Sequence, residues 1–385
     1  MKKICLLALL GSLCFFNNQL PAFDDPEMEH ECTSWMVFSD LTGNNTNILH
    51  KNRDSRYRDI GVFLSPANSV RKWVALGNNP SSNRAVDASA NMAINASGLA
   101  GVMNSGEKCI HKADDQTKKC TPAIMRAIIE SCDTAAQAVE KLRSLLKAGD
   151  YCHGEKGSIF FFCDLKEGYV CELTAKELSV VRYDKGYTVR ANIWLNPGMQ
   201  QLARNLHKVY LNSANRMYVA ISGLNAALDK SGKITLQDIF AISRSHKLPK
   251  DIADRRSVCF KNTNSTASLE LERQYPDVLS TAYVTIGHPL HTVYIPVPVC
   301  AEKVLPVMNN KAWSKAAFDR FDKLGLQDIP AEWVKFERES MAQYIAAREK
   351  ARQLLKSGKR AEAVKLVNTT AEAIWVKAAK LLKLQ

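Results

Sequence analysis

The residues best placed to do chemistry lie in residues 30–55, HECTSWMVFSDLTGNNTNILHKNRDS, where Cys32 follows a segment with the pattern of a removable leader. If cleavage leaves Cys32 as the first residue, this residue carries both a thiol and a free α-amine. An α-amine has a pKa of about 8, so it can accept the thiol proton near neutral pH. Nucleophile and base can therefore come from one residue, which predicts a cysteine nucleophile at a new amino terminus.

A polar cluster follows the nucleophile candidate along the chain. Lys51, Asn52, Arg53 and Asp54 come shortly after the apolar pair Ile48 and Leu49. This pattern is typical of a strand whose end delivers polar side chains to a site. Apolar runs over residues 35–39 and 46–50 flank a polar turn that contains Gly43, so they predict a strand pair.

The first 31 residues predict export and processing. Residues 1–22 have a basic start, an apolar run and a small residue at Ala22, which is the pattern of a secretory signal peptide. An uncleaved anchor is the alternative. Residues 23–31 would then be a short acidic propeptide, and a second cut before Cys32 is required. No later segment is apolar enough to predict a stable membrane span. We expect a periplasmic or secreted protein.

The net charge limits the classes of partner. The whole chain has a formal charge of +13, and residues 1–31 contribute −3, so the rest carries +16. Such a charge favours anionic partners, or it is a solvated basic surface. No basic and aromatic nucleic-acid motif occurs, so we expect no nucleic-acid partner.

Cysteine usage points to an oxidising compartment. Apart from Cys32 and the leader, eight cysteines remain, and an even number in an exported chain predicts disulfides that leave Cys32 free. Cys109 with Cys120 is one candidate pair. The chain has no CxxC or HExxH and no GxGxxG or phosphate-loop motif, so we expect neither a metal nor a cofactor.

The remaining pattern alternates helices and strands. Residues 121–147 predict two helices, and three short strands follow at residues 158–163, 168–173 and 178–183. Ser213 is a good N-cap for a helix to about residue 228, which would put Arg216 in its first turn. Further strands are expected over residues 257–300. Residues 332–356 and 360–384 predict two basic amphipathic helices.

The order of these features resembles the N-terminal-nucleophile (Ntn) hydrolases. The closest branch contains choloylglycine hydrolases, penicillin V acylases, N-acylethanolamine acid amidases and isopenicillin-N acyltransferases. The resemblance covers about residues 32–300, and it rests on the following features: Cys32-Thr33-Ser34, Lys51-Asn52-x-Asp54, Gly98-Leu99, the three-strand meander before Asn192, and Ser213-x-x-Arg216. It implies an α+β, four-layer αββα sandwich over residues 32–330. Residues 331–385 would add a basic helical hairpin, which has no counterpart in the family pattern.

The resemblance also implies roles for six residues. Cys32 is the nucleophile, and Asp54 holds or orients its α-amine. Lys51 or Arg216 keeps the thiol pKa low, although the choloylglycine branch has Arg at the Lys51 position. Asn192 and Asn104 stabilise the oxyanion. Asn196 is the fallback for Asn192, and a simple turn is the alternative for Asn104.

These features predict a hydrolase of linear carbon–nitrogen amide bonds in small molecules, with an anionic substrate slightly favoured. A dipeptidase or an acyltransferase of the same fold is the alternative within the family. A different class is a non-enzymatic envelope protein, stapled by disulfides, that binds anionic ligands through its basic tail. The sequence also leaves a homo-oligomer open.

Overall fold

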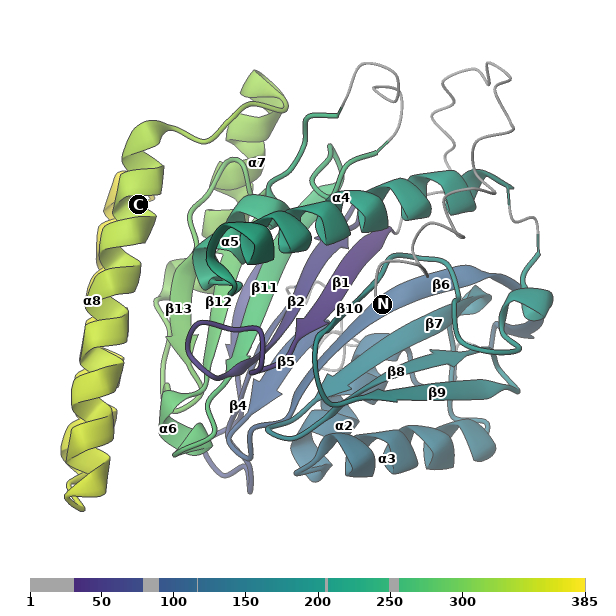
Figure 1. The fold of residues 1–385 in the computed structure, drawn as a ribbon, viewed down its shortest axis with the longest axis horizontal. Helices are drawn as coiled ribbons and strands as arrows, with labels where there is room; N and C mark the ends of the chain where they lie inside the picture. Colours follow the sequence, from purple (N-terminus) through teal and green to yellow (C-terminus); the bar gives the residue numbers. More distant parts are fainter. Residues whose placement is uncertain (1–30, 79–89, 116, 205–206, 249–255, 385) are drawn as a thin grey trace.

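The computed structural model describes residues 31–78, 90–115, 117–204, 207–248 and 256–384. The predicted signal peptide and almost all of the predicted propeptide therefore lie outside the described residues. Two antiparallel sheets are packed face to face (Figure 1), and helices cover their outer faces. The predicted α+β fold, an αββα sandwich, is confirmed.

The first sheet carries Cys32. Its strand order in the described chain is β10-β1-β2-β11-β12-β13. The strands are β1 (Cys32–Val37), β2 (Asn47–Asp54), β10 (Tyr187–Arg190), β11 (Thr263–Leu271), β12 (Thr281–Ile286) and β13 (Ile295–Pro298). Every residue of β1 and β2 is buried, because the second sheet lies on one side of this sheet and helices lie on the other.

The second sheet is a meander that follows the order of the chain. Its strands are β3 (Ile60–Leu64), β4 (Trp73–Asn78), β5 (Met92–Asn95), β6 (Ala100–Ala113), β7 (Gly154–Cys163), β8 (Gly168–Leu173) and β9 (Leu178–Tyr183). The three predicted strands before Asn192 are β7, β8 and β9. Residues 57–76 supply β3 and the start of β4.

Helices form the two outer layers. α4 (His207–Ser231) and α5 (Leu236–Ser243) pack on the first sheet, and α2 (Thr121–Ser131) and α3 (Ala135–Lys147) pack on the second. Capping boxes set the starts of α3 and α5. The Thr134 hydroxyl accepts the backbone N–H of Gln137, and the Thr235 hydroxyl accepts that of Asp238. The short α6 (Pro276–Leu279) and two single 3₁₀ turns, Gln200–Leu202 and Pro306–Met308, lie in connections, and α7 (Ala312–Leu324) contacts β3 and β12.

Ser213 is not a helix cap, so that prediction is wrong. α4 begins at His207, which places Ser213 and Arg216 beyond its first turn. The hydroxyl of Ser213 instead accepts hydrogen bonds from Arg216 Nη2 at 3.3 Å and from the backbone N–H of Asn192 at 3.4 Å. The Ser213 hydroxyl therefore bonds buried groups of the core instead of capping the helix.

The structure shows no disulfide among its nine described cysteines. Cys109 and Cys120, the suggested pair, have different neighbours: Cys109 forms a β-bridge with Ala203, and Cys120 forms one with Cys152. Cys163 and Cys171 are enclosed within the second sheet, where burial raises the pKa of both thiols. The disulfides predicted from the even count are therefore not seen.

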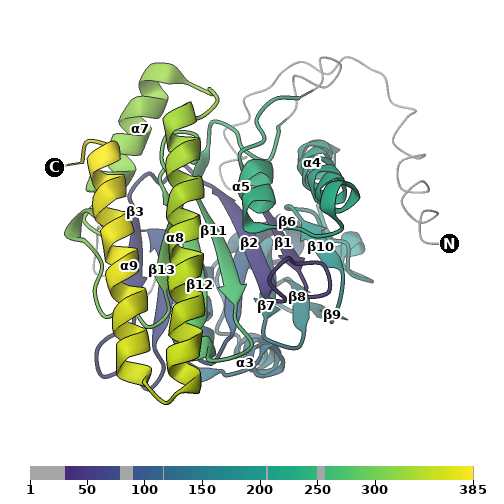
Figure 2. The ribbon, with the colours of Figure 1, turned by 60° about the vertical axis from the view of Figure 1, so that its left-hand side comes forward.

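The two C-terminal helices form an antiparallel pair against β13, the edge strand of the first sheet (Figure 2). They are α8 (Ala331–Lys356) and α9 (Arg360–Leu381). On α8, the Glu337 carboxylate accepts from both Arg244 guanidinium nitrogens, at 2.6 and 2.7 Å, and from the Tyr294 backbone N–H at 2.6 Å. On α9, Trp375 Nε1 donates to the Pro296 carbonyl at 2.6 Å. The hairpin thus covers a strand edge that would otherwise expose unpaired backbone groups.

We predict that Glu337→Gln destabilises the fold strongly. The substitution leaves the Arg244 cation, which is 8% exposed, without its buried counter-charge. Breaking a buried ion pair on one side typically costs about 3–5 kcal/mol. Glu339→Gln is the matched control on the same helix, because Glu339 is exposed and lies 3.9 Å from Lys335. Urea unfolding of both variants measures the difference, and equal unfolding free energies would contradict the prediction.

Candidate active site

Cys32 begins β1, and its pairing with β2 surrounds it with polar side chains. Cys32 lies opposite Arg53, and Ser34 lies opposite Lys51. Because side chains alternate between the faces of a strand, Cys32, Lys51 and Arg53 share one face of the sheet. Cys32 is 5% exposed and its thiol is free.

The peptide bond before Cys32 is itself held in the site. The backbone N–H of Cys32 donates to Asn192 Oδ1 at 2.8 Å. The carbonyl oxygen of Glu31 accepts the backbone N–H of Asp54, also at 2.8 Å. A backbone N–H in this position would stabilise negative charge developing on the Glu31 carbonyl oxygen.

The Lys51 amine shares a buried sheet face with the Cys32 thiol. Burial is the main cause that lowers the pKa of the Lys51 ammonium group, while the negative charge of a Cys32 thiolate opposes that shift. Lys51 Nζ donates to the carbonyl of Met103 and, at 3.0 Å, to Asn104 Oδ1. A neutral amine has two N–H donors and one lone pair, so it can satisfy both acceptors and still accept the thiol proton.

Arg216 and Asn192 hold the backbone around Cys32. Arg216 reaches from α4 and is fully buried; its Nη1 donates to the Cys32 carbonyl at 2.6 Å and its Nη2 to Asn192 Oδ1 at 2.8 Å. Asn192 Nδ2 donates to the Ser105 carbonyl at 2.7 Å. The Asn192 oxygen thus accepts from the Cys32 nitrogen as well, and one Nδ2 proton is already used.

Asp54 lies at the end of β2, beside Thr263 of β11. Burial raises the pKa of its carboxyl to about 7, and Arg216 and the Thr263 hydroxyl oppose that shift. Thr263 Oγ1 donates to Oδ1 at 2.7 Å. Oδ2 has no hydrogen-bond partner in the described part of the chain and lies 3.9 Å from Arg216 Nη1.

Asn104 supports the site from the second sheet. It lies inside β6, so the alternative of a simple turn is wrong. Its Oδ1 accepts from Ser34 Oγ and Lys51 Nζ, and its Nδ2 donates to the carbonyls of Arg190 and Ala191 at 3.3 and 3.0 Å. Asn104 thus fixes the Lys51 amine and the backbone just before Asn192.

The fallback residue Asn196 has a different environment from Asn192. Its Nδ2 donates to the carbonyls of Val170 and Ser179, both at 3.0 Å. Its backbone N–H and that of Leu195 donate to the buried Glu172 carboxylate. Asn196 therefore anchors the segment that carries Asn192, whereas Asn192 makes the contact with Cys32.

Three charged residues at the site were not among the six candidates. Glu31 is 3% exposed, and its carboxylate lies 2.8 Å from Arg256 Nη1 and 3.2 Å from Arg216 Nη2. Arg53 faces Cys32, and burial lowers its pKa to about 10. Its position two residues after Lys51 could have indicated the shared face, whereas no local pattern marks Arg256, which tertiary folding alone brings to Glu31.

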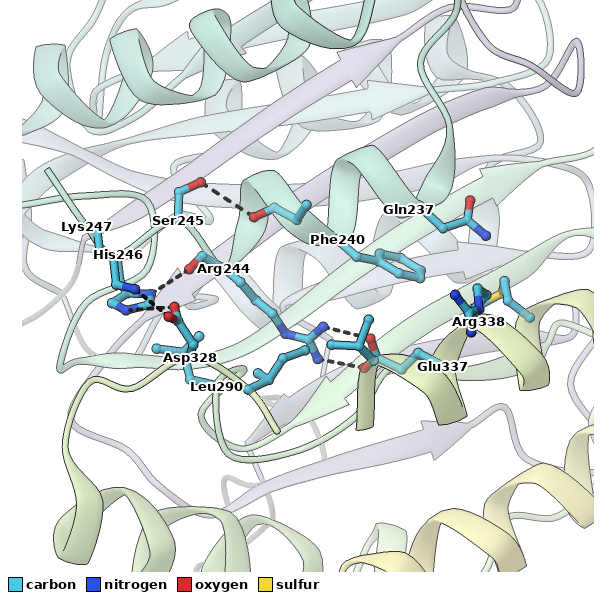
Figure 3. Close-up of a pocket in the computed structure, with 14 residues that line it drawn as sticks. Gln237, Phe240, Arg244, Ser245, His246, Lys247, Leu290, Asp328, Glu337 and Arg338 are labelled. Atoms are coloured by element: carbon cyan, nitrogen blue, oxygen red, sulfur yellow. Dashed lines mark hydrogen bonds and ion pairs between the residues drawn. The ribbon is translucent and has the colours of Figure 1, made fainter. Parts of the chain in front are cut away.

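A cavity of about 610 Å³ lies between α5 and α8, away from these contacts (Figure 3). Its wall includes Phe240, Leu290 and the Arg244–Glu337 ion pair that holds α8. None of the six candidate residues lines it. We therefore assign this cavity no part in the chemistry at Cys32.

The described residues contain neither a cluster of metal ligands nor a helix able to span a membrane. Within the described ranges, no three or more His, Cys, Asp and Glu side chains gather to hold a metal ion. His288 and His291 are both buried, with their ring Nε2 atoms bonded to backbone carbonyls, and burial lowers the pKa of each. Among the helices that the structure describes, none has the length and apolar character needed to cross a bilayer.

The structure has two face-to-face antiparallel sheets with helices on both outer faces, and Cys32 begins one of the inner strands. Residues 87–251 match the model of the acyl-coenzyme A:6-aminopenicillanic acid acyl-transferase family. This match confirms the predicted resemblance to the choloylglycine hydrolase, penicillin V acylase and isopenicillin-N acyltransferase group. It supports an amidase or acylase activity in the broad sense.

The other comparisons give more distant similarities. A variant of the conjugated bile acid hydrolase from Clostridium perfringens is 12% identical, with a TM-score of 0.48 over 71% of this chain and 94% of that chain. Penicillin V acylase from Agrobacterium tumefaciens is 12% identical, with a TM-score of 0.46 over 69% and 86%. Neither similarity carries an argument about activity. No curated protein matches this chain significantly in sequence.

We predict that Asp54→Asn stabilises the uncleaved protein at neutral pH. The unfolded carboxyl loses its proton near 3.8 and the folded one only near 7, so the folded state binds more protons in between and loses stability as pH rises through this window. In a Cys32→Ala background, Asp54→Asn should raise the unfolding free energy by roughly 1–4 kcal/mol at pH 8 and by little below pH 4.

Thermal and urea unfolding across pH 3–9 measure this effect. Asp184→Asn is the control, because Asp184 is exposed and forms only a 3.4 Å surface pair with Arg182. A destabilised Asp54→Asn protein at pH 8, or a difference in unfolding free energy that does not depend on pH, would refute the raised pKa of Asp54.

Proposed function

We propose that this protein is an exported cysteine-nucleophile hydrolase of linear carbon–nitrogen amide bonds in small molecules, matured by cleavage before Cys32. The observation that carries the proposal is the arrangement of the bond to be cut. The Glu31 carbonyl oxygen accepts a backbone N–H at 2.8 Å, and the adjacent Cys32 thiol shares a sheet face with the buried Lys51 amine. The leader pattern of residues 1–22 supports export.

Maturation needs a base other than the α-amine, because that nitrogen is still an amide. Lys51 Nζ can take the thiol proton as Cys32 Sγ attacks the Glu31 carbonyl carbon. The oxyanion accepts the Asp54 N–H. Its collapse breaks the C–N bond, with a proton passing to the Cys32 nitrogen, and gives a thioester of Glu31 on Sγ. Water then hydrolyses the thioester, which releases the Glu31 carboxylate and restores the thiol.

Catalytic turnover repeats these steps on a substrate amide, with the new α-amine as base. Asn192 Oδ1 and Asp54 Oδ2 are the acceptors that can orient the amine: the first already binds this nitrogen, and the second has no other hydrogen bond in the described structure. The α-amine takes the thiol proton and passes it to the departing amine, and water releases the acyl group.

Transfer of the acyl group to an amine instead of water uses the same thioester, and the matched family model is named for an acyl transfer. An amine such as glycine, added during turnover of an N-acyl amide, distinguishes the two: an acyl-glycine product by mass spectrometry identifies a transferase. The free Cys32 thiol favours both enzymes over the disulfide-stapled binding protein, in which Cys32 would be bridged.

We predict that Cys32→Ala abolishes amide hydrolysis and leaves residues 23–31 attached. The reason is that one sulfur serves both the cut before residue 32 and the substrate reaction. Intact-mass measurement of the purified protein reads the processing, and amine release from a panel of N-acyl amides and dipeptides reads the activity. Cys120→Ala, at an exposed cysteine, is the control. A wild-type protein that begins at a residue other than Cys32 would overturn the proposal.

We predict that Lys51→Met slows maturation by about 10²–10⁴-fold, the range expected for a lost general base. The remaining cleavage should rise with pH toward the ordinary thiol pKa of about 8.5, because thiolate must then form without the lysine. Intact mass followed over time at pH 6–10 measures this. Lys185→Met, at an exposed turn residue, is the control.

Two results would decide against Lys51 as the base. One is wild-type maturation of Lys51→Met at pH 7. The other is slow maturation that shows no rise with pH, while unfolding experiments in the Cys32→Ala background show an intact fold.

A further inference from the structure

Before cleavage, the Glu31 carboxylate occupies a site formed by Arg216, which is fully buried, and Arg256, whose side chain is 15% exposed. It lies 2.8 Å from Arg256 Nη1 and 3.2 Å from Arg216 Nη2, and only 3% of Glu31 is exposed. Arg216 comes from α4, and Arg256 is tied to the same helix because its carbonyl accepts Asn215 Nδ2 at 2.9 Å. The Arg256 guanidinium also stacks 5.0 Å above the Phe260 ring. The guanidinium groups are thus held in position by contacts other than Glu31.

Maturation removes this carboxylate with the propeptide but leaves the cations. Arg216 then retains the distant Asp54 carboxylate at 3.9 Å, and no other carboxylate pairs with Arg256 in the described structure. On the opposite face, Arg53 Nη1 is buried without a hydrogen-bond partner among the described residues. A buried cation without a counter-charge is unfavourable, so the mature site favours an anion.

The chemistry of the first cleavage says which part of a substrate carries that anion. Glu31 is the acyl part of the bond broken during maturation, and its carbonyl oxygen is already at the Asp54 N–H. A substrate carbonyl must reach the same sulfur, and if its oxygen uses the same donor its acyl chain extends along the path of Glu31. The leaving amine lies on the other side of the broken bond.

Resting on the proposed function, we propose that Arg256, together with Arg216, forms a carboxylate subsite for the acyl part of the substrate. The substrate class is amides whose acyl group ends in a carboxylate with the spacing of a glutamyl or glutaryl group. Hydrolysis breaks the C–N bond, consumes one water and releases the amine and a dicarboxylic acid. Arg256 is then a specificity residue, whereas Cys32 performs the chemistry.

The test compares three synthetic amides on the matured protein. They are glutaryl p-nitroanilide, its methyl ester, and the pentanoyl amide of p-aminobenzoate, which carries its carboxylate on the amine side. A hydrogen-bonded charged group contributes about 1.5–3 kcal/mol. We therefore expect kcat/KM for the glutaryl amide to exceed that for its methyl ester by about 10–100-fold.

Arg256→Gln should reduce this acid-to-ester ratio by about 10–100-fold. Arg273→Gln is the control, because Arg273 is exposed and its Nη2 donates to the Ser39 hydroxyl at 2.7 Å. If Arg256→Gln does not mature, Glu31→Gln is added so that the two facing side chains are both neutral. The double variant yields the same mature chain, since residue 31 is removed.

The outcomes separate the inference from the proposed function. Equal cleavage of the glutaryl amide and its methyl ester, or an unchanged ratio in mature Arg256→Gln, overturns the carboxylate subsite alone. Preference for the amine-side carboxylate overturns its assignment to the acyl part. Cleavage of none of the three, nor of any wider panel of amides, by protein that begins at Cys32 overturns the proposed hydrolase and the subsite with it.

Discussion

The site depends on the register between β1 and β2. Cys32 lies opposite Arg53, and Ser34 lies opposite Lys51, so the thiol and the lysine amine meet on one buried face. A shift of one residue would turn every side chain of a strand to the other face. The register is held from both sides, because β2 also pairs with β11, and Asn52 Nδ2 donates to the carbonyls of Ser243 and Val258 at 2.7 and 3.1 Å. Changes in packing at these contacts would therefore move Cys32 relative to Lys51.

Much of this arrangement could be predicted from the sequence because the signals are local. The strand pair around Gly43, the two helices of residues 121–147 and the three-strand meander are each indicated by residues close together in the chain. The order of Cys32, Lys51, Asp54, Asn192 and Arg216 along the chain indicates a site, and the structure places these residues around β1 and β2. Their catalytic roles remain predictions that the geometry supports.

What could not be predicted depends on tertiary structure. Arg256 is far from Glu31 in sequence terms, and nothing in its neighbours marks a carboxylate partner. Ser213 has the residue type of a helix cap, yet α4 begins at His207, and the Ser213 hydroxyl instead accepts from Arg216 and from the backbone N–H of Asn192. The cysteine count predicts bridges only if the thiols meet in space, and Cys163 and Cys171 are instead enclosed separately within a sheet.

The charges at the site also connect folding, maturation and binding. While Glu31 is present, the carboxylates of Glu31 and Asp54 face the guanidinium groups of Arg216 and Arg256, so the uncut chain can fold with its buried cations paired. If cleavage before Cys32 follows folding, as proposed, the loss of Glu31 leaves Arg256 without a carboxylate partner in the described structure and leaves Arg216 with only Asp54 at 3.9 Å. On this proposal, the Glu31 side chain balances the charge of a site that later attracts a substrate.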